Sequence, residues 1–169
     1  VAAGFIIGEH LIKLGCRRIC FVSPPNSAPT IDARIAGLRQ AKVRHGLSNE
    51  EGWIFEGEGR NPVFVRKVLG QGKPEAIVCS NDYTAAVLMQ SLAKAGIRVP
   101  QDMKVVGFDD VRFATLVSPP LTTVHQPYRE IAVTAFGAMM DRLEQPLIPT
   151  RQISLTPRLV IRDSCGAYQ

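Results

Sequence analysis

The chain has 169 residues, of which 46% are hydrophobic and 21% charged, a composition typical of a globular protein that buries a substantial core. No apolar run reaches the roughly 18–20 residues needed to span a bilayer, and the first residues lack the basic segment and cleavage site of a signal peptide. We therefore expect no membrane insertion. The net charge is +5, but the basic residues are scattered and form no nucleic-acid-binding motif, so we expect no sequence-specific DNA binding by this chain.

Helices and strands alternate along the chain, and this alternation predicts an α/β fold with a parallel sheet. Pro157 interrupts the last strand region, which is typical of an edge strand. The expected elements, in chain order, are a helix at 2–14, a strand at 17–23, a helix at 30–45, a strand at 53–56, a helix at 62–69, a strand at 75–79, a helix at 83–95, strands at 104–108 and 121–124, a helix at 128–143 and strand residues within 153–161.

Side chains that begin a helix are visible at two places. Asn61 followed by Pro62 has the pattern of an N-cap and a first helical residue. Thr30 or Asp32 is expected to cap the helix that runs to His45.

Polar residues follow two of the expected strands directly. The apolar run 104–108 ends in Asp109 and Asp110, and the run 75–79 ends in Ser80-Asn81-Asp82. Ligands of open α/β sheets bind beyond the carboxyl ends of the strands, so this edge is expected to hold a ligand rich in hydroxyls or amides. Adjacent residues of a strand point to opposite faces, so one aspartate is expected to bind ligand and the other to bind backbone or cap a turn.

Arg34 is the expected partner of Asp109 at this edge. It lies in the first turns of the helix at 30–45, and its planar fork suits vicinal hydroxyls or a carboxylate. The alternative is that Arg34 is an ordinary surface cation. His125 follows the strand at 121–124 and is a further candidate for contact with a ligand.

Motifs of catalysis and of metal binding are missing from the sequence. Gly57-Glu58-Gly59 is only part of a dinucleotide loop, because Pro62 occupies the position of the last glycine. The cysteines form no CxxC pair, and reduced thiols of this kind fit a cytoplasmic protein. We therefore expect no catalytic residue, no metal and no cofactor. The cysteines are Cys16, Cys20, Cys79 and Cys165.

Four motifs together resemble one protein family. They are R-x-x-G at 34–37, S-N-D at 80–82, V-x-G-F-D-D at 105–110 and L-T-T-V-x-Q at 121–126. In this combination, residues 1–163 look like the effector-binding core of lactose-repressor-type (LacI/GalR) transcription regulators. The resemblance implies a fold like that of type I periplasmic binding proteins, with two parallel-sheet lobes and a cleft between them.

The resemblance also implies a division of the chain. Residues 1–29 and 124–163 are expected to form part of an N-terminal lobe, residues 30–123 the C-terminal lobe, and residues 164–169 a tail. In the family, a helix-turn-helix headpiece and the first half of the N-terminal lobe precede the residues matched here. We therefore expect an incomplete N-terminal lobe, in a chain that is a piece of a longer protein and reaches operator DNA only through the headpiece.

The function implied is the sensing of a small effector, expected to be a carbohydrate, although Arg34 with Asp109 also suits purines. The resemblance implies a homodimer through the C-terminal lobe, formed by the helix that begins near Thr84 and the loop 113–118. The alternative is a periplasmic-type sugar-binding protein of a transport system, while an enzyme would need a nucleophile or metal set that the sequence lacks. The ligand-binding residues carried over from the family are Thr30, Arg34, Asn81, Asp109 and Gln126.

Overall fold

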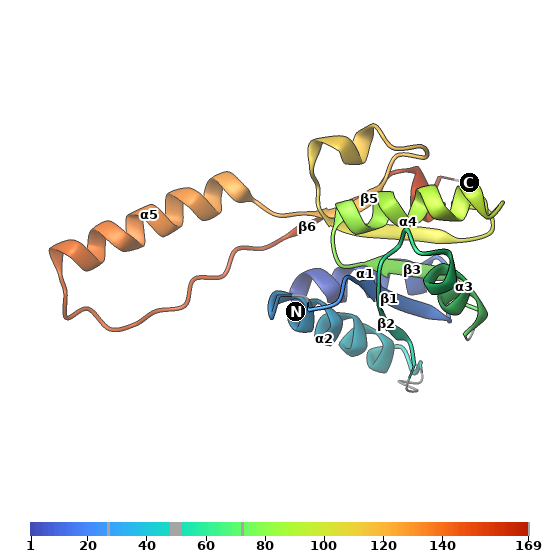
Figure 1. Ribbon diagram of the computed structural model, residues 1–169. Coiled ribbons are helices and arrows are strands. Elements are labelled where there is room, and N and C mark those ends of the chain that lie inside the picture. The colour runs from blue at the N-terminus through green and yellow to red at the C-terminus, as the bar shows by residue number, and fades with distance from the viewer. Residues whose placement is uncertain (27, 48–51, 72, 169) are drawn as a thin grey trace.

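The computed structural model describes residues 1–26, 28–47, 52–71 and 73–168, and Gln169 of the expected tail lies outside this set (Figure 1). The helices are α1 (Ala2–Lys13), α2 (Thr30–Arg44), α3 (Pro62–Gly70), α4 (Asp82–Lys94) and α5 (Tyr128–Glu144), with 3₁₀ turns at Arg112–Thr115 and Asp163–Cys165. The strands are β1 (Ile19–Ser23), β2 (Ile54–Glu56), β3 (Ala76–Cys79), β4 (Lys104–Asp109), β5 (Thr122–His125) and β6 (Arg158–Val160).

The described strands form one six-stranded sheet in the order β2-β1-β3-β4-β5-β6. All neighbouring pairs are parallel except β5 and β6, which run antiparallel. The α/β fold with a mostly parallel sheet is therefore confirmed, and β6 lies at an edge as Pro157 indicated. Only 158–160 of the region 153–161 is strand.

Two apolar cores hold α3 and α4 on one face of the sheet and α1 and α2 on the other (Figure 1). One core contains Val68 of α3 and Leu88 of α4 against Ile77 of β3. The other contains Leu11 of α1 and Leu38 of α2. The strands β1 and β3 are buried along their whole lengths, as expected for parallel strands covered on both faces.

Glycine allows α1 and α2 to pack closely. A Cβ atom on Gly4 would lie 1.9 Å from the backbone oxygen of Arg34, and one on Gly37 would lie 1.9 Å from that of Val1. No side chain fits at either position, so these glycines set the separation of the two helices. The contact fixes the first turns of α2, which contain Arg34.

The helix caps agree with the sequence at one expected position and differ at the other. The Asn61 side chain accepts hydrogen bonds from the backbone N–H groups of Val63 and Phe64. The cap expected at Thr30 or Asp32 is wrong, because α2 already begins at Thr30, and Pro29 before it offers no side-chain acceptor.

The division into lobes differs from our expectation. The strand at 17–23, assigned to a partial N-terminal lobe, pairs with β3, and β5 pairs with β4. The described strands thus form a single sheet rather than the sheets of two lobes. The physical reason is the close contact of α1 with α2 through Gly4 and Gly37, which holds β1, between these two helices in the chain, in the same sheet as β3.

Helix α5 and residues 145–157 lie apart from this sheet, in an arm that leaves after β5 and returns at β6 (Figure 1). None of the residues of α5 is buried. Among the described helices, none is long and apolar enough to cross a membrane.

The expected tail is part of the folded body. Ser164 is buried, and its hydroxyl donates to the backbone oxygen of Val105 at 2.6 Å and accepts from the N–H of Thr122 at 2.8 Å. Residues 164 and 165 are therefore held against β4 and β5, in a contact between distant segments that the sequence did not indicate.

Candidate ligand-binding site

At the carboxyl ends of β1 and β3, the order in which successive strands join the sheet reverses. After β1 the chain crosses through α2 to β2, and after β3 it crosses through α4 to β4 on the other side. Open α/β sheets bind ligands at such a reversal, because the two loops diverge and leave a crevice. The polar residues predicted from the sequence lie at this edge.

Arg34 and Asp109 form an ion pair there. The guanidinium donates to Oδ1 of Asp109 at 3.0 Å and to the backbone oxygen of Ser80, and it lies 4.7 Å from the centre of the Phe108 ring. Gln126 donates its side-chain amide to the same Oδ1 at 2.6 Å. The structure therefore brings together three of the five residues expected to bind ligand, from α2, β4 and the chain leaving β5.

Both bonds to Asp109 end on Oδ1, so the described residues leave Oδ2 of this carboxylate without a hydrogen bond. A partly exposed carboxylate beside a guanidinium offers an acceptor and donors together, the combination that binds vicinal hydroxyls. The backbone of Asp109 has a φ of 107°, and the Tyr128 hydroxyl donates to its backbone oxygen at 2.8 Å. Strained backbone of this kind concentrates at functional sites.

The other two expected residues lie at the same edge but make no contact with the ion pair. Asn81 uses its side-chain oxygen to cap α4, accepting from the N–H of Thr84 at 2.8 Å. Thr30 is exposed, one turn before Arg34 on α2, and residues four apart share a helix face. Their role in ligand binding stays a prediction.

A hollow of about 300 Å³ adjoins the ends of β1, β2 and β3. Its rim includes Pro24, Glu58 and Arg60, and Arg60 donates to the Tyr83 hydroxyl at 3.2 Å. The lining combines the charged Glu58 and Arg60 with apolar residues such as Val87, and the hollow extends the surface that a ligand can contact at this edge of the sheet.

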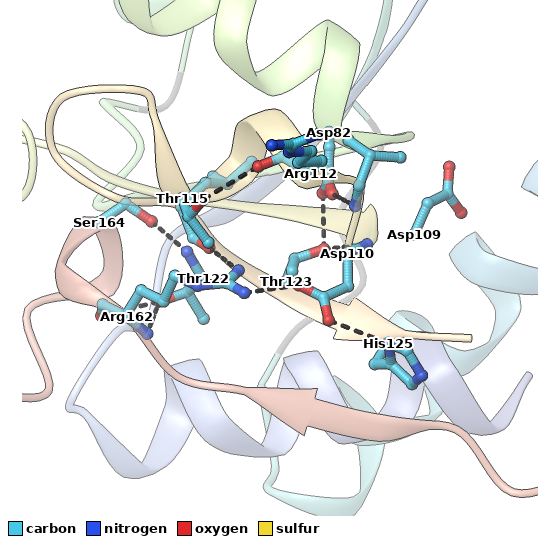
Figure 2. A network of polar contacts seen from close by, with 12 residues as sticks. Asp82, Asp109, Asp110, Arg112, Thr115, Thr122, Thr123, His125, Arg162 and Ser164 are labelled. Atoms are coloured by element: carbon cyan, nitrogen blue, oxygen red, sulfur yellow. Dashed lines mark hydrogen bonds and ion pairs between the residues drawn. The ribbon is translucent and has the colours of Figure 1, made fainter. Parts of the chain in front are cut away.

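Asp110 faces away from Asp109, as the alternation of strand residues predicts (Figure 2). Its carboxylate pairs with His125 at 2.9 Å and with Arg162 at 2.6 Å. Burial alone would raise the pKa of Asp110, but the hydrogen bonds from Arg162 and His125 lower it. The sequence predicted the opposite orientation of the two aspartates. It did not predict that His125 would contact Asp110, on the side away from Asp109.

Asp82 is a buried carboxylate behind the site. It accepts from the Thr123 hydroxyl at 2.6 Å and from the N–H of Val111 at 2.9 Å. Burial, with a contribution from the charges of Asp109 and Asp110, raises its pKa to about 6 in spite of these two hydrogen bonds. Asp82 joins the start of α4 to β5 and to the loop after β4.

The contacts of Tyr128 and Phe108 were missed by the sequence analysis. Tyr128 starts a helix, and nothing in its spacing indicates that its hydroxyl reaches back to β4. Phe108 reads only as a core residue in the apolar run 104–108. Among the described residues, no group of three or more His, Cys, Asp or Glu side chains has the arrangement of a metal site.

Comparison with known proteins identifies the class to which this arrangement belongs. A family model described as a periplasmic binding protein-like domain matches residues 9–165. The chain therefore belongs to this family of domains, in agreement with the sheet order and with the position of the polar residues at the strand ends.

Within this class, the similar proteins are transcriptional regulators of the LacI type. The chain is 33% identical over 165 residues to the HTH-type transcriptional repressor PurR of Photobacterium profundum, in a match that covers 95% of this chain and 49% of that protein. The chain thus spans about half the length of this relative. The resemblance to LacI-type regulators that the motifs indicated is confirmed, and the similarity does not favour a transport protein.

Two solved structures agree with this assignment. A regulatory protein of the LacI family from Chloroflexus aggregans superposes with a TM-score of 0.85 at 29% identity, covering 96% of this chain and 60% of that one. A LacI-family transcriptional regulator from Enterococcus faecium, with bound ribose, has a TM-score of 0.84 at 25% identity and covers 96% and 62%.

Proposed function

We propose that this chain is the effector-sensing part of a LacI-type transcription regulator and binds a small hydroxyl-rich molecule, with a carbohydrate as the first candidate. The main support is the Arg34–Asp109 ion pair, with Gln126 on the same carboxylate oxygen, at the reversal point of the sheet. Oδ2 of Asp109 accepts a ligand hydroxyl, and Arg34 donates to a neighbouring oxygen. A ribose-bound structural neighbour is consistent with this ligand class.

The site is proposed to bind and not to catalyse. The relatives are regulators rather than enzymes. Gln126 and Arg34 both bond to Asp109, and a ligand replaces part of these bonds. If the ligand favours one arrangement of the chain around Gln126, this preference shifts the equilibrium between two states, which is the thermodynamic requirement for regulation.

Calorimetry with a panel of monosaccharides, a disaccharide and purine bases tests this function. Asp109→Ala removes a charge-assisted acceptor and is expected to weaken binding of the best ligand by at least about tenfold, since such bonds contribute about 1.5–3 kcal/mol each. Asp102→Ala is the matched control, because Asp102 pairs with Arg98 on the surface, outside the site. Equal affinities of the Asp109→Ala variant and the unmodified chain would refute the assignment.

The arm is proposed to belong to a second lobe. Helix α5 exposes an apolar stripe, and the curated relative is about twice as long as this chain. In the full regulator, we propose that the rest of that lobe covers this stripe and that a DNA-reading headpiece precedes it. The residues of the stripe are Ile131, Val133, Phe136, Met139, Met140 and Leu143.

Self-association is proposed through the part of the sheet body that contains α4 and the loop after β4. Our expectation for α4 needs correction, since Leu88, Met89 and Leu92 pack into the core and are not available to a partner. The loop after β4 retains an exposed Leu116. We propose a homodimer through this loop, with two-fold symmetry as the commonest arrangement. The four described cysteines are free thiols, so we place the regulator in the cytoplasm.

A further inference from the structure

Asp110 contacts the residue at which the arm leaves the sheet and a residue that follows β6. His125 is the last residue of β5, where the chain leaves for α5, and it pairs with Arg158, where the arm returns. Arg162 lies beyond the other end of β6, where its N–H donates to the Thr122 hydroxyl. The carboxylate of Asp110 accepts from His125 through Oδ2 and from Arg162 through Oδ1 (Figure 2). One side chain therefore links the outgoing end of β5 to the segment that follows β6.

Surrounding bonds hold this contact in one geometry. The N–H of Asp110 donates to the Thr123 hydroxyl at 3.3 Å, and that hydroxyl donates to the buried Asp82. Arg162 also donates to the backbone oxygen of Leu121 at 2.8 Å. Only 13% of the Asp110 side chain and 17% of the Arg162 side chain are exposed, so solvent screens their ion pair less than a surface pair.

The segment that follows β5 also contacts Asp109, on the ligand-binding side. Gln126 directly follows His125 and bonds to the carboxylate of Asp109, and Tyr128 bonds to the backbone oxygen of Asp109. Asp109 and Asp110 thus contact one short segment, residues 125–128, from opposite sides. A movement of His125 relative to Asp110 changes the direction from which Gln126 approaches the ligand-binding carboxylate.

We infer that Asp110, held in place by Arg162, is a positioning residue that clamps His125 at the point where the arm leaves the sheet, and thereby orients Gln126 toward Asp109 and α5 relative to the sheet. The inference rests on the proposed function, because it assumes that Asp109 binds the effector. A ligand that displaces Gln126 from Asp109 then loosens one side of the segment 125–128 while the Asp110 clamp holds the other. The clamp is the pivot about which the arm turns.

The orientation of the arm is measurable without a ligand. Cysteines introduced at the exposed residues Lys94 of α4 and Glu144 of α5 accept spin labels, while the native cysteines are buried. Pulsed electron resonance on the 169-residue chain then gives the distribution of distances between the labels. Asp110→Ala is expected to make this distribution roughly twice as broad, because His125, at the root of the arm, loses the side chain that holds it.

Two further variants separate the clamp from a general loss of folding. Asp110→Asn keeps the shape and one acceptor oxygen, so its distribution is expected to lie between those of the unmodified chain and Asp110→Ala. Asp163→Ala removes an aspartate next to Arg162 that makes no contact with Asp110, and it is expected to leave the distribution unchanged. If Asp110→Ala folds only poorly, the Asp110→Asn result decides, and an unchanged width there overturns the clamp.

Ribose binding by calorimetry distinguishes failure of the clamp from failure of the proposed function. If ribose binds the unmodified chain, Asp110→Asn is expected to weaken it by about threefold to tenfold through the loss of Gln126 positioning. If no member of the ligand panel binds the unmodified chain, the proposed function fails while the distance widths still test the clamp. Unchanged widths together with ligand binding overturn the clamp alone.

Discussion

Helices α4 and α5 have similar compositions but very different surroundings. Both contain alanine, leucine and methionine among charged and polar residues. In α4, apolar residues pack on the sheet, and Leu88 and Leu92 are fully buried. In α5, no residue is buried, and the large apolar side chains are exposed.

The difference shows that an apolar helix face predicts that a partner exists, without saying where the partner lies. The connections at both ends of α4 return the chain to the same sheet, whereas β5 and β6 direct α5 away from it (Figure 1). An exposed apolar stripe of this length is rare on a monomer and marks an interaction surface. Substitutions in the two helices therefore test the comparison directly.

The largest effect is expected at the centre of α4. Leu88 has no exposed surface, and Leu88→Ala removes apolar contacts and leaves a cavity between α4 and the sheet. The free energy of unfolding, measured by urea denaturation, is expected to fall by about 2–5 kcal/mol. Phe136→Ala in α5 is the matched comparison, because that ring is 61% exposed, and we expect a change within about 0.5 kcal/mol.

The comparison fails if the two substitutions destabilise the chain equally. In that case, the face of α5 packs against something in solution, and measurements at several protein concentrations show whether a second copy covers it.

A smaller effect is expected from pH at the first turn of α4. Burial raises the pKa of Asp82 from an ordinary value of 3.8 to about 6, so the folded chain holds this proton more tightly than the unfolded chain. Asp82 therefore contributes stability below about pH 4 that is lost as the pH rises through about 6. This shift of the Asp82 pKa corresponds to a loss of unfolding free energy on the order of 3 kcal/mol.

The Asp82→Asn variant isolates this contribution from other titrating groups. Asn cannot ionise, so the unfolding free energy of the unmodified chain relative to the variant is expected to decrease between about pH 4 and pH 7. The variant also weakens the bond from the N–H of Val111, which lowers its stability by an amount that does not depend on pH. Parallel stability curves for the two chains would show that Asp82 is not perturbed by burial.

Local signals explain which parts of the fold the sequence predicted. The alternation of helices and strands, the Asn61 cap and the opposite orientation of Asp109 and Asp110 depend on a few neighbouring residues. Such features are readable because backbone geometry alone fixes them. The pairing of Arg34 with Asp109 was predicted from the family motifs, from the position of Asp109 at a strand end and from that of Arg34 in the first turns of a helix.

Distant contacts explain what the sequence did not predict. The place of β1 between β2 and β3 depends on how α1 packs on α2 through Gly4 and Gly37. Likewise, the contact of Asp110 with Arg162 joins residues that are 52 positions apart, with the whole arm between them. No periodicity in one segment contains such information, because both partners must first be placed by the fold.

The dimer surface provides the third test, since Leu116 is exposed like the residues of α5 but is proposed to contact a second copy of this chain. Its side chain is 77% exposed in the loop after β4. Leu116→Asp places a charge in the proposed contact and is expected to weaken self-association by at least about tenfold, which corresponds to about 1.4 kcal/mol. Sedimentation equilibrium measures this change, and Val43→Asp, exposed on α2, is the control.

The fold of the Leu116→Asp variant is expected to stay intact, because an exposed position contributes little to stability. A chain that sediments as a monomer at high micromolar concentration before any substitution would contradict the proposed contact.

The smallest effect is expected from removal of the side-chain cap at the start of α3. The Asn61 side chain accepts from two backbone N–H groups at the beginning of α3, whereas Pro127 before α5 provides no side-chain cap. Asn61→Ala leaves those donors to water and is expected to lower the free energy of unfolding by about 1 kcal/mol. Asn61→Asp keeps the acceptor and adds a negative charge at the positive end of the helix dipole, so we expect it to retain the stability of the unmodified chain. Thermal unfolding of the three chains ranks them, and an Asn61→Asp variant as unstable as Asn61→Ala would show that the side chain acts through packing rather than as a cap.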